Sequence, residues 1–280
     1  MLIDAHQHLW WPERGDYGWL TPDRVRLYRD FGPNEVGSAL AAHGVQAGVV
    51  VQAAPTLAET RHLLAVAGDT PAVAAVVGWI DLEATDAVDT LTELARVPKF
   101  RGVRPMLQAL PEDDWILKPS LRSAIDAVVD LDLSFDALIQ PRHLTSMLRL
   151  VDRHPRLRVV VDHGAKPAIG RQAWGNWADA LAELATRPNV HCKLSGLFNE
   201  MDRDQPVAEA DRYVRHLIAA FVPERLMWGS DYPMLLESER SLDDWVRASR
   251  GWIAQLNEPA QARILGGTAA DFYRIQGGWT

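Results

Sequence analysis

Eight short, almost uninterrupted apolar runs are spaced along the whole chain, and they constrain the fold more than any other feature. They cover residues 2–6, 47–52, 73–79, 100–104, 133–138, 157–162, 189–194 and 226–229. Runs such as those at 49–51 and 159–161 do not alternate apolar with polar residues. Continuous apolar runs of this length are typical of parallel strands that are buried on both faces. The sequence therefore predicts eight mostly buried, parallel strands.

Helical patterns fill the intervals between these runs. The spacing of Thr56 and Glu59 fits a capping box, which predicts a helix that begins there and ends near Gly68. Pro119 and Pro141 suit the first turns of two further helices. Strands that alternate with helices form either an open doubly wound sheet or a closed barrel. Because no glycine-rich phosphate loop follows the first run, we expect the closed alternative, an α/β fold of the (β/α)₈ TIM-barrel type.

Chain length and charge narrow the class further. A single barrel commonly needs about 250 residues, so the 280 residues of this chain fit one domain over 1–280. The formal net charge is −8, and no cluster of Lys and Arg stands out, so we expect neither nucleic acid nor a membrane as a partner. Cys192 is the single cysteine, and no apolar run approaches the roughly 18 residues of a membrane helix. With no secretion signal at the N-terminus, the expected location is the cytoplasm.

Three imidazoles and one carboxylate stand where predicted strands end. His6 and His8 lie two residues apart at the end of the first strand, so both side chains can point the same way. His163 follows the sixth strand and Asp231 follows the eighth. In a closed barrel the first and last strands are neighbours, which would bring Asp231 beside the two histidines. A carboxylate next to imidazoles can deprotonate an attacking water, although each residue alone could be structural.

Four further residues are candidates for contacts with a substrate. Arg104 ends the fourth strand and could hold a substrate oxygen or instead pair with a neighbouring strand, and Gln52 ends the second. Trp19 and Arg29 belong to the long segment 9–33 after the first strand, where an aromatic ring could stack on a sugar or simply pack the loop. Lys193 and Ser195, on the seventh strand and just beyond it, are weaker candidates of the same kind.

Several motifs together resemble the amidohydrolase superfamily, and within it the lactonase-like branch of the amidohydrolase 2 type. This branch contains fuconolactonases and 2-pyrone-4,6-dicarboxylate lactonase. The resemblance covers essentially the whole chain. The motifs that carry it are Ile-Asp-Ala-His-Gln-His-Leu-Trp at 3–10, Arg-Asp-Phe at 29–31, Gly-Val-Arg at 102–104, Asp-His-Gly-Ala-Lys-Pro at 162–167, Lys-Leu-Ser-Gly-Leu at 193–197 and Trp-Gly-Ser-Asp-Tyr-Pro at 228–233.

The resemblance implies a hydrolase that opens a small lactone, such as an L-fucono- or related aldonolactone. Asp231 then matches the general base, and His6, His8 and His163 match residues that polarise the carbonyl or hold a metal. One divalent ion bound by these four residues, Zn²⁺ by ligand type, and a metal-independent reaction are both open. The bridging lysine of two-metal relatives has no counterpart, because the four lysines lie at 99, 118, 166 and 193.

Two other functions compete with the lactonase hypothesis. A metal-dependent decarboxylase or C–C hydrolase of the same superfamily would need one more catalytic histidine on a late strand, and His191 is the nearest candidate. A catalytically inactive binding barrel would be expected only if the set of four were broken. The lactone itself is the expected small-molecule partner, and the oligomeric state stays open, with a homodimer as one alternative.

Overall fold

The computed structural model describes residues 1–276, and eight parallel strands form its centre. They are β1 (Ile3–Gln7), β2 (Ala47–Val51), β3 (Val73–Gly78), β4 (Phe100–Val103), β5 (Ser134–Ala137), β6 (Arg158–Val161), β7 (Val190–Leu194) and β8 (Leu226–Trp228). Each strand pairs with the next one along the chain. All eight predicted strands are confirmed, each to within one residue at either end.

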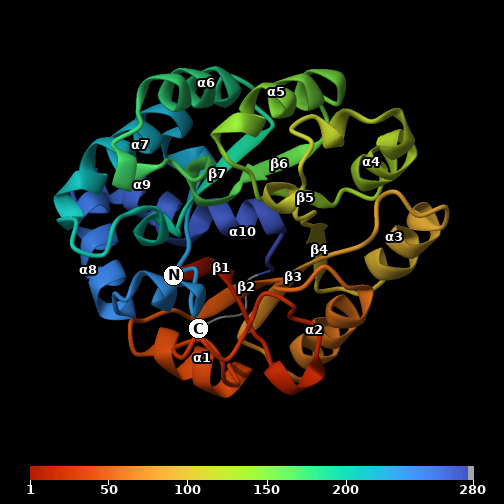
Figure 1. Ribbon diagram of the computed structural model, residues 1–280, viewed down its shortest axis with the longest axis horizontal. Coiled ribbons are helices and arrows are strands. Elements are labelled where there is room, and N and C mark those ends of the chain that lie inside the picture. Colours follow the sequence, from red (N-terminus) through yellow and green to blue (C-terminus); the bar gives the residue numbers. More distant parts are fainter. Residues whose placement is uncertain (277–280) are drawn as a thin grey trace.

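The sheet closes where β1 meets the residues that follow β8. The Asp231 amide donates to the His6 carbonyl at 2.8 Å, and the His8 amide donates to the Tyr232 carbonyl at 2.9 Å. These two bonds join the first and last segments, so the strands form the ring seen in Figure 1. The predicted barrel is confirmed, and its closure carries Asp231 to β1.

Helices surround the ring, apart from the last one, which lies across the centre of the view (Figure 1). They are α1 (Pro33–Ala41), α2 (Leu57–Asp69), α3 (Ala87–Ala95), α4 (Arg122–Asp130), α5 (Leu144–Arg153), α6 (Gly175–Ala185), α7 (Asp211–Arg225), α8 (Leu242–Ile253), α9 (Glu258–Ala262) and α10 (Thr268–Tyr273). In the part of the chain that is described, no helix is both long and apolar enough to cross a membrane.

The predicted helix after β2 begins as expected but uses its acidic residue differently. Thr56 Oγ1 accepts from the Glu59 amide at 3.0 Å, as a capping box requires. The Glu59 carboxylate instead accepts from the amides of Ala53 and Ala54, both at 2.9 Å. The loop between β2 and α2 is therefore tied to the helix by a buried carboxylate.

Two apolar clusters form the core. The larger one fills the space between the strands and the outer helices. The smaller one lies inside the barrel, where Ile3, Val49 and Met227 pack with Phe272 and Tyr273 of α10. Gly266, just before α10, lies against the backbone of Met1 and Ile3, so α10 covers the end at which the strands begin. The opposite end remains available for a site.

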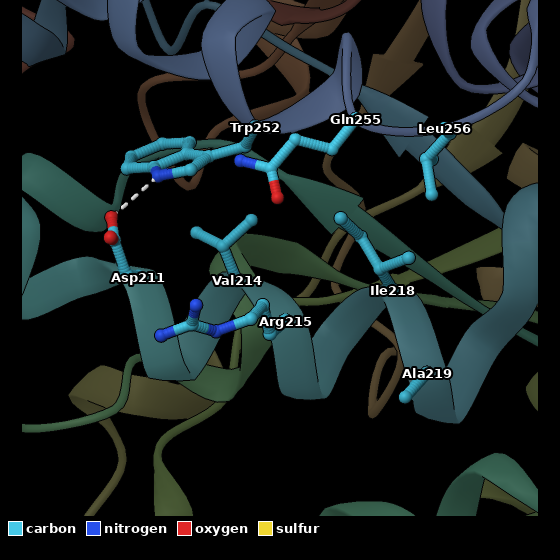
Figure 2. A pocket seen from close by; sticks show the side chains of 8 residues that line it. All are labelled: Asp211, Val214, Arg215, Ile218, Ala219, Trp252, Gln255 and Leu256. Atoms are coloured by element: carbon cyan, nitrogen blue, oxygen red, sulfur yellow. Dashed lines mark hydrogen bonds between the residues drawn. The ribbon is translucent and has the colours of Figure 1, made fainter.

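A shallow groove lies on the outer layer between α7 and α8 (Figure 2). Val214 and Ile218 form part of its floor, and the Trp252 indole donates to Asp211 Oδ1 at 2.7 Å along one side. None of the residues that the sequence predicts for a site lines this groove. The chemistry must be sought at the ends of the strands.

Candidate active site

Three imidazoles converge on one carboxylate oxygen at the end of the barrel where the strands finish. Asp231 Oδ1 lies 3.7 Å from His6 Nε2, 3.4 Å from His8 Nε2 and 3.8 Å from His163 Nε2. All four side chains are at least 95 % buried. The structure therefore brings together the four residues that the sequence predicts for catalysis, from the ends of β1, β6 and β8.

Backbone geometry explains why Asp231 and His163 reach this point. Asp231 has a left-handed backbone, with φ of 56°, which turns its side chain back toward β1. Gly196 passes so close that an added Cβ would lie 2.4 Å from His163 Nδ1 and 3.1 Å from Asp231 Oδ2. With φ of 64° as well, position 196 requires glycine if both side chains are to keep their places.

Asp4 connects β1, which carries His6, to the segment after β8, which carries Asp231. Its Oδ1 accepts from the amides of His6 at 3.0 Å and Ser230 at 2.8 Å, and its Oδ2 accepts from the Ser230 hydroxyl. Burial raises the pKa of Asp4 to about 7, against the opposing effect of the Ser230 hydrogen bonds. The carboxyl of Asp4 thus sets the register between β1 and the segment that carries Asp231.

Hydrogen bonds on the far side of two imidazoles orient their rings. His8 Nδ1 lies 2.8 Å from the Val51 carbonyl, which can only accept, so His8 carries its proton on Nδ1. His163 Nδ1 lies 2.8 Å from Ser195 Oγ. Nε2 of His8 is then a lone pair that faces Asp231. This is the arrangement by which proteins usually prepare histidine for a metal.

His6 stands between an anion and a cation. Its Nδ1 lies 3.3 Å from Asp162 Oδ1 and 3.1 Å from Lys193 Nζ, and all three side chains are fully buried. If Nδ1–H donates to Asp162, then Nε2 is free to bind a metal. If Lys193 donates to Nδ1, then Nε2 carries the proton and points at His8 Nε2, 3.2 Å away. The surroundings of His6 support both tautomers.

Electrostatics keep the carboxylate of Asp231 ionised and the imidazoles of His6 and His163 neutral. Burial by itself would raise the pKa of Asp231, but the three imidazoles around it, His163 first, outweigh burial and hold it well below its usual range. Burial lowers the pKa of His163 to about 4, although Asp231 and Asp162 oppose the change. Burial and then Lys193 lower the pKa of His6. At neutral pH the site therefore offers one anionic carboxylate beside the neutral imidazoles of His6 and His163.

This set of donors fits a single divalent ion. One ligand atom each from His6, His163 and Asp231 can lie within 4.8 Å of the other two, and His8 is not part of this tighter group. His8 Nε2 still lies 3.2 Å from His6 Nε2, close to the edge of a tetrahedron with metal–nitrogen bonds of about 2.0–2.1 Å. Nitrogen donors with one carboxylate are the set expected for Zn²⁺.

Two fixed cations next to His6 disfavour a second metal ion. Lys193 Nζ lies 3.1 Å from His6 Nδ1, and Arg104 Nη1 lies 3.5 Å from His6 Nε2. Arg104 also lies 3.5 Å from Asp162 Oδ2 and donates to the Gln52 carbonyl. A second dication here would be repelled by both side chains, in agreement with the expected single site.

The four predicted substrate contacts lie at different distances from this centre. Arg104 is in it, and its buried Nε has no hydrogen-bond partner among the described residues. Gln52 donates to the Arg104 carbonyl at 3.0 Å, and its Oε1 is likewise buried and unpartnered within residues 1–276. The Trp19 indole donates to the Ala53 carbonyl at 2.7 Å, on the loop after β2. Arg29 pairs with Glu35 and lies 3.9 Å over the Phe31 ring, so it is the weakest candidate.

Sequence reasoning missed a buried ionic network beneath the site. Lys193 Nζ donates to Asp136 Oδ2 at 2.6 Å and lies 3.0 Å from Asp162 Oδ1. The Tyr273 hydroxyl of α10 donates to the same Asp136 oxygen at 2.6 Å. A lysine or an aspartate inside an apolar strand is rarely fully buried unless it is paired, so Lys193 and Asp136 together were the available signal.

The chain matches known proteins over nearly its full length. The amidohydrolase family model (Amidohydro_2) covers residues 3–275. An L-fucono-1,5-lactonase of Burkholderia ambifaria is 48% identical, with 98% of this chain and 95% of that protein aligned. A second L-fucono-1,5-lactonase, from Burkholderia multivorans, is 34% identical over 98% of this chain and 96% of its own length.

Solved structures agree with this assignment. The crystal structure of an amidohydrolase from Burkholderia multivorans with bound zinc superposes with a TM-score of 0.93 at 32% identity. The superposition covers 99% of this chain and 100% of that one. With the family model, the curated relatives and this structure in accord, the chain belongs to the amidohydrolase family.

Proposed function

We propose that this protein is a lactonase that opens a sugar lactone, either L-fucono-1,5-lactone or a closely related aldonolactone. The observation that carries the proposal is the convergence of three imidazoles on Asp231. The substrate class is supported by the two relatives named L-fucono-1,5-lactonase, which this chain matches over nearly its full length.

Asp231 acts as the general base in this proposal. Its depressed pKa keeps it ionised at neutral pH, so it can accept a proton from a water molecule that attacks the lactone carbonyl. The new bond converts the carbonyl carbon to a tetrahedral oxyanion. The bond to the ring oxygen then breaks, and Asp231 returns the proton to that oxygen. The product is the open hydroxy acid.

The protonation of the imidazoles favours a metal-assisted form of this reaction. His8 must donate from Nδ1 to the Val51 carbonyl, so a neutral His8 cannot also donate from Nε2 to the substrate oxygen. Its lone pair suits a metal instead. A divalent ion held by His6, His163 and Asp231, with His8 beside them, would supply Lewis-acid polarisation of the carbonyl. In this proposal Arg104, whose Nη1 lies 3.5 Å from His6 Nε2 and whose Nε is unpartnered within the described residues, contacts the oxyanion.

A pH-monitored screen of lactones, run with and without a chelator, tests the proposal. We expect rapid proton release with aldono-1,5-lactones and a large loss of rate after chelation that Zn²⁺ restores. Metal content measured after chelation and reloading gives a separate count, expected at one ion per chain. Failure to hydrolyse any aldonolactone with the metal restored would reject the function. If the rate is unchanged after complete metal removal, the lactonase function stands, but the hypothesis that it depends on a metal is rejected.

The rival decarboxylase would require His191 as an additional catalytic residue. His191 packs against Phe272 of α10, with ring centroids 4.6 Å apart, at the covered end of the barrel. It therefore cannot join the other imidazoles. An inactive binding barrel was expected only if one of the four catalytic residues were missing, and His6, His8, His163 and Asp231 are all present in the site. Cytoplasmic location, a single domain over 1–280 and a homodimer stay predictions.

A further inference from the structure

Four consecutive residues after β6 have a left-handed backbone. The φ angles of His163, Gly164, Ala165 and Lys166 are 53°, 58°, 60° and 51°. Only glycine adopts this conformation without strain, and such strained segments gather at functional sites when the surrounding structure holds them in place. A strained run of this length therefore suggests that the turn has a functional role in addition to connecting β6 to the next helix.

Surrounding contacts hold the turn rigidly. The Trp177 indole donates to the Gly164 carbonyl at 2.8 Å, and the Lys166 amide donates to the His163 carbonyl at 2.9 Å. Leu217 packs so closely on Gly164 that an added Cβ would lie 3.1 Å from its methyl groups. His163 faces Asp231, and Lys166, three residues later, faces Glu200. The strained turn thus presents one imidazole and one ammonium together.

Lys166 meets an acidic partner beside the catalytic carboxylate. Its Nζ lies 3.5 Å from Glu200 Oε1, and the two side chains are only 21% and 19% exposed. This separation is longer than a direct hydrogen bond, so both groups keep free hydrogen-bonding capacity. Asn199, which precedes Glu200, donates to Asp231 Oδ2 at 3.4 Å. The Lys166–Glu200 pair is therefore linked to the general base by neighbouring residues.

The pair lines a groove of the right size for a small substrate. The groove has a volume of about 460 Å³ and is also lined by Gln140 and Asn199 and by three further charged side chains, those of Arg142, Arg171 and Asp202. Volumes of about 300–1,000 Å³ are usual for small-molecule sites. Because Asn199 touches both the groove and Asp231, a lactone whose carbonyl sits among the imidazoles can extend its ring substituents into this space.

The Lys166–Glu200 pair has free hydrogen-bond donors and acceptors, which suit the hydroxyl groups of a substrate. A hydroxyl can donate to Glu200 while a neighbouring one accepts from Lys166, so two adjacent hydroxyls satisfy both charged groups. A carboxylate would gain from Lys166 but would be repelled by Glu200. Of the other charged side chains in the groove, Arg142 is already paired with Asp113, and Asp202 balances the charge of Arg171. We propose that Lys166 and Glu200 bind adjacent hydroxyl groups of the lactone ring and so select an uncharged polyhydroxylated lactone over a carboxylated one. This inference rests on the proposed lactonase function and identifies its specificity-determining residues.

Kinetics on two lactones that differ only in hydroxylation test the inference. We compare an aldono-1,5-lactone with δ-valerolactone, which has the same ring without hydroxyls. In Glu200→Ala the ratio of kcat/KM values for the two substrates should fall about 10- to 100-fold, mainly through KM for the sugar lactone. Glu200→Gln should retain much of this ratio, because an amide still accepts from a hydroxyl. Lys166→Met should lower the ratio in the same direction.

A matched control and a charged substrate complete the experiment. Glu209→Ala removes an exposed glutamate that does not line the groove and should leave the ratio as in the wild type. A carboxylated lactone should be hydrolysed relatively better by Glu200→Gln than by the wild type. Equal losses on both uncharged lactones in Glu200→Ala, or an unchanged ratio, would overturn the assignment. If the wild type hydrolyses no aldonolactone at all, it is the proposed function itself that fails.

Discussion

The two ends of the barrel are built on opposite physical principles. Where the strands begin, the interior is apolar and is covered by α10, with Phe272 packed among aliphatic side chains. Where the strands finish, the interior holds His6, Arg104, Asp162 and Lys193, all buried and all paired. Apolar burial is nondirectional and tolerates small shifts, whereas buried charges require exact partners. The closed end therefore stabilises the protein, and the open end performs its chemistry.

The two regions meet at a single buried carboxylate. Asp136 accepts from Lys193 on the catalytic side and from Tyr273 of α10 on the closed side, both at 2.6 Å. Burial raises the pKa of Asp136, and Lys193 opposes that change. The following substitutions test how far stability and activity separate along this axis.

Asp231→Asn should have the largest effect, and it should fall on activity. We expect kcat on an aldonolactone to drop about 10²–10⁴-fold, since removing a general base costs this much. Asparagine tolerates the left-handed backbone at this position, so the backbone should add no strain, and any fall in the free energy of unfolding in urea should come from the lost carboxylate, whose low pKa shows that its charge stabilises the fold. A variant that keeps most of its kcat would remove Asp231 from the mechanism.

Lys193→Met should damage both ends, because it leaves Asp136 and Asp162 without their shared cation. Breaking a buried pair in this way destabilises a protein by about 3–5 kcal/mol, measured as the free energy of unfolding in urea. The double variant Lys193→Met/Asp136→Asn should recover part of the loss. Lys99→Met serves as the control, since Lys99 Nζ only donates to the carbonyls of Ala67 and Thr70. Equal losses in the two single variants would argue against the network.

Phe272→Ala should damage the closed end alone. Removal of a buried phenylalanine costs about 3–5 kcal/mol in free energy of unfolding, depending on how far the cavity collapses. Below the unfolding temperature, kcat and KM should stay within about twofold of the wild type. A substantial change in KM with intact folding would show that the two ends are linked more tightly than their packing suggests.

His191 should give the smallest effect, visible only as a dependence of stability on pH. Burial, followed by the charges of Arg225, Arg158 and Arg263, lowers its pKa to about 4. The unfolded chain takes up this proton near pH 6.5, so the stability that neutral His191 contributes is present above pH 6.5 and is lost as pH falls toward 4. The loss should amount to roughly 2–3 kcal/mol. His191→Leu should unfold in urea with a visibly flatter profile over this range. Parallel profiles for the two proteins would contradict the assignment.

Much of the fold could be read from local sequence. The eight strands were predictable because a strand that is buried on both faces needs apolar residues at successive positions, and this gives a continuous apolar run in the sequence. His6, His8, His163 and Asp231 were predictable because each follows such a run, and the carboxyl ends of barrel strands share one face. That a closed ring would place Asp231 against β1 followed from counting strands.

Other features depend on contacts between distant parts of the chain. Asp136 and Tyr273 are separated by 137 residues, and only the packing of α10 under the barrel brings them together. The left-handed turn after β6 needs Trp177 and Leu217 to hold it, so no local propensity could have indicated it. The sequence by itself determined the barrel and the residues at its rim, because hydrophobic pattern and strand order suffice for both. The tertiary structure decided the proton position on His8, the buried pairs below the imidazoles and the Lys166–Glu200 pair beside them, because hydrogen bonds and charges act only at the distances that packing sets.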